Sequence, residues 1–351
     1  MAKSTSIIDP LGDDNVVINY RYTISSYGAD YPVDAIVKRV VNKDIFVPHF
    51  QRDFVWTAKQ SSKFIESLLL GFPVPGIFLA KDTSSPRLSV LDGLQRLRTL
   101  EFFYNGYFAR SERKFRLSGV QEEFNGLTYA DLSDEDRVRL DNFIIHATIV
   151  KQDEPTDDIS SIYYLFERIN TGGTQLAPQE IRTCLSFGPF VSLIQELNLN
   201  DEWRDIFGPL NRRMRDQEMI LRFFGMLYSR SKYKRPMKSF LNMTLGHNRD
   251  LGRISKQQLH DDFIHAITLV HKSVGSKAFR PQRAFNAAVF DSVMVGIATS
   301  QRKNDKLTPA KVKRSYDKLL KNRSYMISVT KATADEDAVK HRMKLAIEAF
   351  A

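Results

Sequence analysis

Cysteine is nearly absent from this sequence, and long apolar runs are missing. Cys184 is the single cysteine among 351 residues, which excludes an intramolecular disulfide framework and a metal site built from several cysteines. Its neighbours Thr183 and Leu185 favour a buried small side chain over a nucleophile. No apolar run approaches the roughly 18 residues that a membrane-spanning helix needs. The opening residues, MAKSTSIIDPLGDDNV, lack the apolar core of a signal peptide. We therefore expect a cytoplasmic protein without a membrane partner.

Acidic residues are scarce in the second half of the chain. The composition of the whole chain, with 42% hydrophobic and 26% charged residues, is ordinary for a globular protein. Residues 1–200 carry 21 Lys and Arg against 26 Asp and Glu, a net charge of −5. Residues 201–351 carry 30 against 15, a net charge of +15. Such a basic half predicts a polyanionic partner, most often nucleic acid. The alternative is a solvated basic surface that binds no particular ligand.

The basic residues of the second half recur in three short clusters, which we take as the expected DNA contacts. The nine candidates are Arg212, Arg213, Arg215, Lys232, Lys234, Arg235, Lys311, Lys313 and Arg314.

The apolar periodicity before residue 187 alternates between strands and helices. A capping box at Thr57 and Gln60 opens one of the helices. The predicted elements are a helix over 33–41, a strand over 45–47, a helix over 58–70, strands over 76–80, 87–91 and 143–151, and helices over 157–169 and from Pro178.

After residue 187 the periodicity predicts helices alone. They lie near 189–198, 216–229, 256–273, 282–300, 309–326 and 336–350. The chain is long enough for two domains with cores of their own. We therefore predict an α+β fold, with a loose leader over 1–25, a mixed domain over 26–185 and a basic all-α domain over 186–351.

The stretch from Val90 to Arg98 joins a short buried strand to a helix through Asp92-Gly93. A helix N-terminus presents backbone N–H groups and the positive end of the helix dipole, which together favour an anion. Gln95 and Arg96 lie in the first turn, so their donors can reach the same place. The alternative is purely structural, because Asp92 and Gln95 have the spacing of a capping box.

Polar side chains follow the ends of two further predicted elements. Gln51 and Arg52 follow one strand, while Arg168 and Asn170 end a helix. Arginines bind phosphate bidentately, amides orient water and a carboxylate holds a divalent ion, so this inventory suits a nucleoside triphosphate with Mg²⁺. The prediction requires that the three element ends meet around one pocket.

These residues, taken in order, resemble the N-terminal domain of GmrSD-type restriction endonucleases. The resemblance covers roughly residues 30–185, and Arg213-x-x-Asp216-x-Glu218-x-Ile220-x-Arg222-Phe223 extends it more loosely. The matching motifs are Val47-Pro48-x-Phe50-Gln51-Arg52-x-x-Val55-Trp56, a Pro-x-Pro after the next helix, Asp92-Gly93-x-Gln95-Arg96, and Phe166-x-Arg168-x-Asn170-Thr171-Gly172-Gly173 with Leu176 and Glu180.

The resemblance implies a ParB/sulfiredoxin-like domain that binds and hydrolyses a nucleoside triphosphate. It implies a catalytic set of Asp92, Gln95 and Arg96, with Asp92 also as the metal ligand. The implied nucleotide-binding residues are Gln51, Arg52, Gly93, Arg96, Arg168 and Asn170. The family signature is D-G-Q-Q-R, and Leu94 replaces its first glutamine here, which puts hydrolysis in more doubt than binding.

Full-length members of the family often end in an HNH nuclease domain, which needs a histidine-rich metal motif. Gly246-His247-Asn248-Arg249-Asp250 lacks the partners of that motif, and His260 and His265 are not at the i, i+4 spacing of one helix face. We therefore expect no nuclease site in residues 186–351, and a separate nuclease subunit as the partner if DNA is cut.

Three functions remain open on the sequence alone. The first is a nucleotide-dependent module of a restriction or anti-phage defence system that contacts DNA through its basic half. The second is a non-catalytic DNA-binding or regulatory protein on the same fold, which Leu94 and the missing nuclease motif favour. The third is a Mg²⁺-dependent nuclease that uses the first-domain pocket, with Asp92 as metal ligand.

Overall fold

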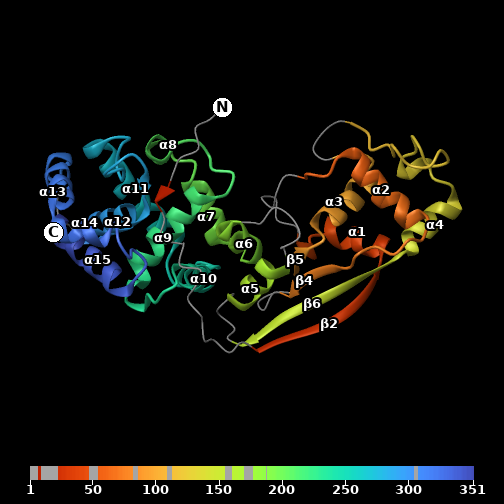
Figure 1. Ribbon diagram of the computed structural model, residues 1–351, viewed down its shortest axis with the longest axis horizontal. Coiled ribbons are helices and arrows are strands. Elements are labelled where there is room, and N and C mark those ends of the chain that lie inside the picture. The colour runs from red at the N-terminus through yellow and green to blue at the C-terminus, as the bar shows by residue number, and fades with distance from the viewer. Residues whose placement is uncertain are drawn as a thin grey trace. The chain divides into compact units, whose positions relative to one another are not determined.

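The computed structural model describes residues 7–8, 23–46, 54–81, 86–108, 113–154, 160–169, 177–186, 188–303 and 307–351. The chain divides into two compact units. The sheet unit comprises Arg21–Thr156 and Ser161–Leu176, and the helical unit comprises Met1–Tyr20, Asp157–Ser160 and Ala177–Ala351. The fold is therefore mixed α+β, as the periodicity predicts (Figure 1).

The sheet unit is built on five strands in the order β2-β6-β4-β5-β3. β2 pairs with β6 and β4 with β5 in antiparallel fashion, whereas β6 with β4 and β5 with β3 are parallel. The strands are β2 (Thr23–Pro32), β3 (Ile45–Phe46), β4 (Ile77–Lys81), β5 (Leu88–Asp92) and β6 (Ile144–Glu154). The predicted hairpin of β4 and β5 is confirmed.

Helices cover one face of this sheet and form its core. Ile145, Ala147 and Ile149 alternate along β6, so their side chains share the face that packs against apolar side chains of the first three helices. The helices of this unit are α1 (Val33–Val41), α2 (Ala58–Leu69), α3 (Leu94–Asn105), α4 (Asp134–Asn142) and α5 (Ser160–Ile169), with a 3₁₀ turn at Tyr129–Asp131. The capping box predicted at Thr57 and Gln60 is confirmed.

Strand β2 lies in a stretch for which the sequence predicts no strand, and it begins at Thr23, inside the predicted leader. Its side chains are exposed from Thr23 to Gly28, so the alternation that identifies a half-buried strand is missing. The other described part of that leader, Ile7–Ile8 (β1), pairs in parallel with Phe285–Asn286 (β7) of the helical unit.

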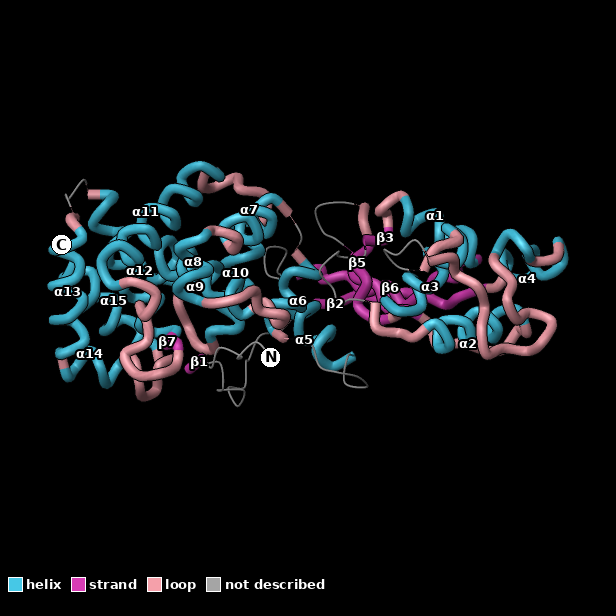
Figure 2. The backbone as a smooth tube through the Cα atoms, turned by 90° about the horizontal axis from the view of Figure 1, so that it is seen from above, coloured by secondary structure: helices cyan, strands magenta, loops and turns pink. Residues whose placement is uncertain are grey.

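The helical unit is a bundle of ten helices within the described residues, with β1 and β7 as its two short strands (Figure 2). Its helices are α6 (Pro178–Leu185), α7 (Pro189–Leu197), α8 (Asp201–Phe207), α9 (Arg215–Ser229), α10 (Met237–Asn248), α11 (Lys256–Val274), α12 (Ala287–Arg302), α13 (Pro309–Lys321), α14 (Arg323–Ser328) and α15 (Glu336–Phe350). α12 is central: its side chains from Ala287 to Ala298 are all buried. Cys184 is buried, as expected.

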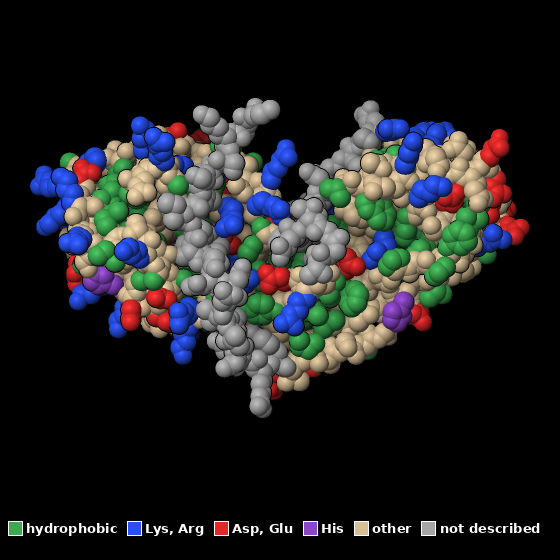
Figure 3. Space-filling view, viewed as in Figure 1, with side chains coloured by type: hydrophobic (Ala, Val, Ile, Leu, Met, Phe, Trp, Pro, Cys, Tyr) green, Lys and Arg blue, Asp and Glu red, His purple; other side chains and the backbone are tan. Residues whose placement is uncertain are grey.

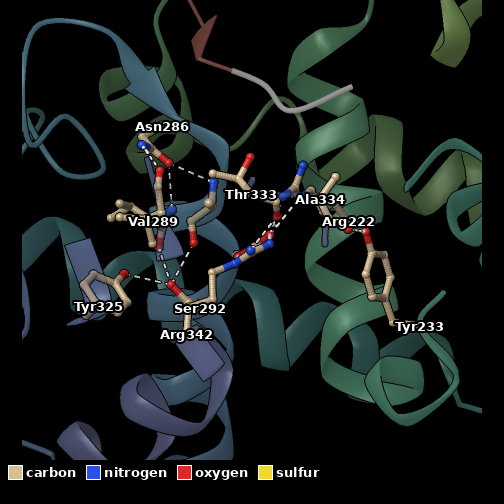
Figure 4. A network of polar contacts seen from close by, with 12 residues as sticks. Arg222, Tyr233, Asn286, Val289, Ser292, Tyr325, Thr333, Ala334 and Arg342 are labelled. Atoms are coloured by element: carbon tan, nitrogen blue, oxygen red, sulfur yellow. Dashed lines mark hydrogen bonds and ion pairs between the residues drawn. The ribbon is translucent and has the colours of Figure 1, made fainter. Parts of the chain in front are cut away.

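Buried ion pairs join the helices of this unit. Asp291 on α12 accepts hydrogen bonds from Arg222 of α9 and Arg342 of α15, and all three side chains are fully buried (Figure 4). Glu218 of α9 pairs with Arg182 of α6 at 2.7 Å, again without exposure. Charged residues of the Arg213–Phe223 motif therefore hold the core of the bundle together.

Candidate functional site

The junction between β5 and α3 is the centre of the candidate site. Asp92 is the last residue of β5, and Gly93 turns the chain with φ +96° and ψ 10° before α3 begins at Leu94. A side chain would not fit at Gly93, because its Cβ would lie 2.5 Å from Cγ2 of Ile77. Gly93 is the N-cap and has no side chain that could cap this turn, so among the described residues the structure gives the first backbone N–H groups of α3 no side-chain acceptor.

Arg96 is held at this junction by two contacts of one nitrogen. Its Nη2 donates to Oδ2 of Asp92 at 2.9 Å and to the carbonyl of Gly76 at 3.0 Å. The Arg96 side chain is 15% exposed and that of Asp92 is 42% exposed. Nε of Arg96 is buried, and within the described part of the chain it has no hydrogen-bond partner. The guanidinium is thus fixed in place with donor capacity left over.

Gln95 connects this junction to the chain that enters α2. Its Oε1 accepts hydrogen bonds from the backbone N–H groups of Val55 at 3.0 Å and Trp56 at 3.3 Å. Phe54, the preceding residue, packs its ring edge-on against Phe102 of α3. The segment that follows the Phe-Gln-Arg motif is therefore brought to the first turn of α3.

The capping-box alternative for Asp92 and Gln95 is wrong. Gly93 is the N-cap, because its carbonyl accepts the first helical hydrogen bond from the N–H of Leu97, so Asp92 lies one position too early to cap α3. The two side chains instead make separate contacts, Asp92 with Arg96 and Gln95 with the backbone of Val55 and Trp56.

The remaining predicted nucleotide-binding residues are placed only in part. Gln51, Arg52 and Asn170 lie outside the described residues. Arg168 is exposed in the last turn of α5, and the structure gives no contact between it and Asp92 or Arg96. The structure therefore brings Val55 and Trp56 to the first turn of α3 through Gln95, while the meeting of the three expected element ends stays a prediction.

Leu94 and Gly76 also belong to this site, although their residue types do not indicate a role in binding. Leu94, which stands where the family signature has glutamine, packs half-buried against the core of the sheet unit. Gly76 contributes its carbonyl oxygen to Arg96, and a Cβ at this position would lie 2.7 Å from the carbonyl oxygen of His146. A backbone carbonyl carries no residue-type signal, although the Pro-Val-Pro-Gly sequence does mark a rigid turn.

A second polar cluster lies at the other end of α3. Tyr104 and Tyr129 both donate hydrogen bonds to Asp141, at 2.6 Å and 3.0 Å. Burial and the hydrogen bond to Asp141 raise the pKa of Tyr129 to about 12 and that of Tyr104 further. Tyr104 is 12 residues beyond Asp92, so about 18 Å of helix separates this cluster from the candidate site.

The nine basic residues expected to contact DNA fall into two groups. Those with carboxylate partners are Arg213 with Glu180, Arg215 with Glu218, Arg235 with Asp335 and Lys313 with Asp317. Those that are exposed, with no carboxylate partner in the described ranges, are Arg212, Lys232, Lys234, Lys311 and Arg314. The clusters near 212 and 232 lie at opposite ends of α9, which is about 22 Å long. The three clusters therefore do not form one continuous patch.

Among the residues that the structure describes, no group of three or more His, Cys, Asp or Glu side chains could hold a metal ion. The helices of these residues are also too short or too polar to cross a membrane.

A known protein family matches part of the chain. The model of the family described as GmrSD restriction endonuclease, N-terminal domain, matches residues 35–187. Neither the curated proteins nor the solved structures gave a significant match. The matched range includes Val55, the junction from Asp92 to Arg96, and Arg168. Over residues 35–187 this chain is therefore similar to GmrSD-type N-terminal domains, as its sequence motifs predict.

Proposed function

We propose that the chain is the nucleoside-triphosphate-binding and hydrolysing module of a restriction system, and that its basic helical unit contacts DNA. The family match supports the assignment to a restriction system. A ParB/sulfiredoxin-like topology of the sheet unit and a cytoplasmic location are parts of the same proposal. A separate nuclease subunit would cut the DNA.

The observation that carries nucleotide binding is the open donor set at the start of α3. The first turn of α3 has no side-chain cap, and the buried Nε of Arg96 lacks a partner among the described residues. Backbone N–H groups at a helix N-terminus and an arginine fork both suit phosphate oxygens. A triphosphate placed here would satisfy donors that the described protein groups leave open.

The other roles follow from position. Arg52 precedes the anchored Val55 by three residues in the sequence, and its guanidinium would bind a phosphate. Oδ1 of Asp92 has no partner in the described ranges, and Mg²⁺ is commonly bound by one or two carboxylates together with substrate phosphates. Asp92 would therefore hold Mg²⁺, while the amide of Gln95 and the exposed Arg168 would complete the site.

The test compares two arginines of the same helix. In Arg96→Ala, binding of an NTP with Mg²⁺ and phosphate release should both be lost. Arg98→Ala is the matched control, because Arg98 pairs with Glu101 on α3 but lies outside the first turn. Equal nucleotide binding by wild type and Arg96→Ala would contradict the proposal.

Leu94 favours a second candidate, a nucleotide-binding or regulatory protein without turnover. In that case wild-type protein binds NTP and releases no phosphate, with or without DNA. Leu94→Gln restores the family residue and should then raise phosphate release while leaving nucleotide affinity within a few-fold. Mg²⁺-dependent cleavage of plasmid that is lost in Asp92→Ala would instead identify a nuclease.

A further inference from the structure

Helix α13 carries its apolar and basic residues on opposite faces. The buried residues are Val312, Tyr316 and Leu319. The exposed basic residues, which we call the α13 stripe, are Lys311, Arg314, Lys318 and Lys321. Their spacing of three, four and three residues places them along one side of a helix. At 3.6 residues per turn, the centres of the two faces lie about 145° apart.

The charges of the α13 stripe are not neutralised by any carboxylate that the structure describes. Lys313, on the flank of the helix, is paired with Asp317 at 2.6 Å. Within the described part of the chain, none of the four stripe residues has such a partner. The segment 309–331 contains seven Lys and Arg against one Asp, so it supplies +6 of the +15 net charge of residues 201–351.

The apolar face of α13 is already occupied. Val312, Tyr316 and Leu319 belong to the core of the helical unit, where α13 packs against α11 and α15. α13 lies at the outer edge of this unit, and Lys and Arg side chains gather along that edge (Figures 1 and 3). A basic amphipathic helix binds a membrane through a free apolar face, so the packing of α13 argues for a soluble polyanion.

We propose that the α13 stripe is the site at which the helical unit binds the phosphate backbone of duplex DNA. This inference rests on the proposed DNA contact and assigns it to one surface. The stripe extends over about 15 Å of helix, and duplex DNA carries one phosphate per about 1.7 Å of its axis, so phosphates are available to all four cations. Such contacts fix the position of DNA without reading its sequence.

The experiment measures the affinity of the full chain for a 25-base-pair duplex at several salt concentrations. In the stripe variant, Lys311, Arg314, Lys318 and Lys321 are each replaced by Gln, which keeps helix propensity and removes four charges. The plot of log K against log salt has a negative slope. Loss of four phosphate contacts should reduce the magnitude of this slope by about 3.6. We expect an affinity loss of at least tenfold at low salt, with an unchanged thermal unfolding midpoint.

A matched control removes the same charge elsewhere on the helical unit. Arg253, Lys277, Arg283 and Lys303 are exposed, with no carboxylate partner in the described ranges, and they lie outside α13. Replacing these four by Gln should leave the salt slope within one of the wild-type value. A loss of affinity equal to that of the stripe variant would overturn the assignment to α13.

A third variant and a second probe separate the remaining outcomes. If Arg212→Gln with Lys232→Gln and Lys234→Gln loses DNA while the stripe variant retains it, the DNA contact stands and the α13 assignment falls. If wild-type protein shows no salt-dependent retention of DNA, the DNA part of the proposed function itself falls. Binding to phosphatidylserine vesicles, but not to DNA, would replace the polyanion by a membrane surface.

Discussion

The side-chain oxygen of Gln95 accepts a hydrogen bond from the backbone N–H of Val55, 40 residues earlier in the chain, at 3.0 Å. The same oxygen accepts from Trp56, so one amide ties the first turn of α3 to the chain that enters α2. Gln95→Ala removes the acceptor for both N–H groups. We expect the free energy of unfolding to fall by about 1 kcal/mol, and nucleotide affinity to fall with it, as measured by urea unfolding and by titration with NTP and Mg²⁺.

Gln95→Glu is the control that separates anchoring from catalysis. A carboxylate still accepts from Val55 and Trp56, so stability should stay close to that of wild type, whereas the donors of the amide are gone. Phosphate release should fall in this variant even though the segment stays anchored. If Gln95→Glu unfolds as easily as Gln95→Ala, the side-chain oxygen is not what holds the two segments together.

Gly93 is required by both conformation and space. Gly93→Ala puts a Cβ at φ +96°, 2.5 Å from Cγ2 of Ile77, so either the β5–α3 junction or β4 must move. We expect a loss of about 2–4 kcal/mol of unfolding free energy, from the backbone strain and the overpacking together.

Gly106 provides the comparison for Gly93. It lies at the other end of α3 with φ +79°, and a Cβ there would meet no atom within 4 Å. Gly106→Ala should therefore cost only the backbone term, about 1–2 kcal/mol. Equal losses in the two variants would show that the contact with Ile77 contributes nothing.

Elements that bury a regular apolar face could be predicted from the sequence. The helix over 33–41 has the predicted bounds, and α2 and α9 begin within a residue of theirs. α8 was missed because its seven residues are too few to show a helical period. α10 was missed because Asn242 and Thr244 interrupt its apolar face, although both are buried and hydrogen-bonded.

Some helix ends could not be predicted from the apolar periodicity, because tertiary contacts and local caps set where these helices begin and end. The helix predicted over 282–300 begins at Ala287, because Phe285 and Asn286 pair with β1 and Asn286 caps α12. The helix predicted over 309–326 is divided at Asn322, whose side chain accepts from the N–H of Tyr325 and starts α14. Asparagine is favourable as a helix cap and unfavourable inside a helix, so its presence alone does not tell which role it has.

The sequence indicates which side chains form the candidate site, but it does not indicate which backbone groups take part. Asp92 and Arg96 are residues whose types suit a metal and a phosphate, and the structure joins them at 2.9 Å. The carbonyl of Gly76 and the N–H of Val55 complete the arrangement, but any residue supplies such groups. Their roles depend on the chain fold alone, so no residue pattern could reveal them.

Asp291 is the carboxylate that two buried arginines share, so its replacement should lower the stability of the helical unit strongly. Asp291→Asn keeps the side-chain shape and removes the carboxylate charge that the guanidiniums of Arg222 and Arg342 share in the core. Breaking a buried ion pair in this way costs about 3–5 kcal/mol. We expect this loss in urea unfolding of the full chain.

The exposed pair of Arg235 and Asp335 is the control for Asp291. Both side chains are about half exposed, so solvent screens their attraction. Asp335→Asn should cost less than about 1 kcal/mol. A small loss at both positions would mean that the buried arginines find other partners or water once Asp291 is neutral.

Tyr129 should make the sheet unit sensitive to alkaline pH. Burial and its hydrogen bond to Asp141 raise the pKa of this phenol to about 12 in the folded protein, against about 10 in an unfolded chain. The folded state therefore retains a proton that the unfolded state loses, and the resulting stabilisation is fully present below pH 10 and is lost as the pH rises through 12. In Tyr129→Phe this contribution is absent, so the variant should be slightly less stable than wild type at pH 8 and should lose less stability between pH 10 and 12.

Urea unfolding at pH 8, 10 and 11 measures the difference, with Tyr27→Phe, at an exposed tyrosine of β2, as the control. An equally steep decline in wild type and Tyr129→Phe would show that the bond to Asp141 does not couple this phenol to folding.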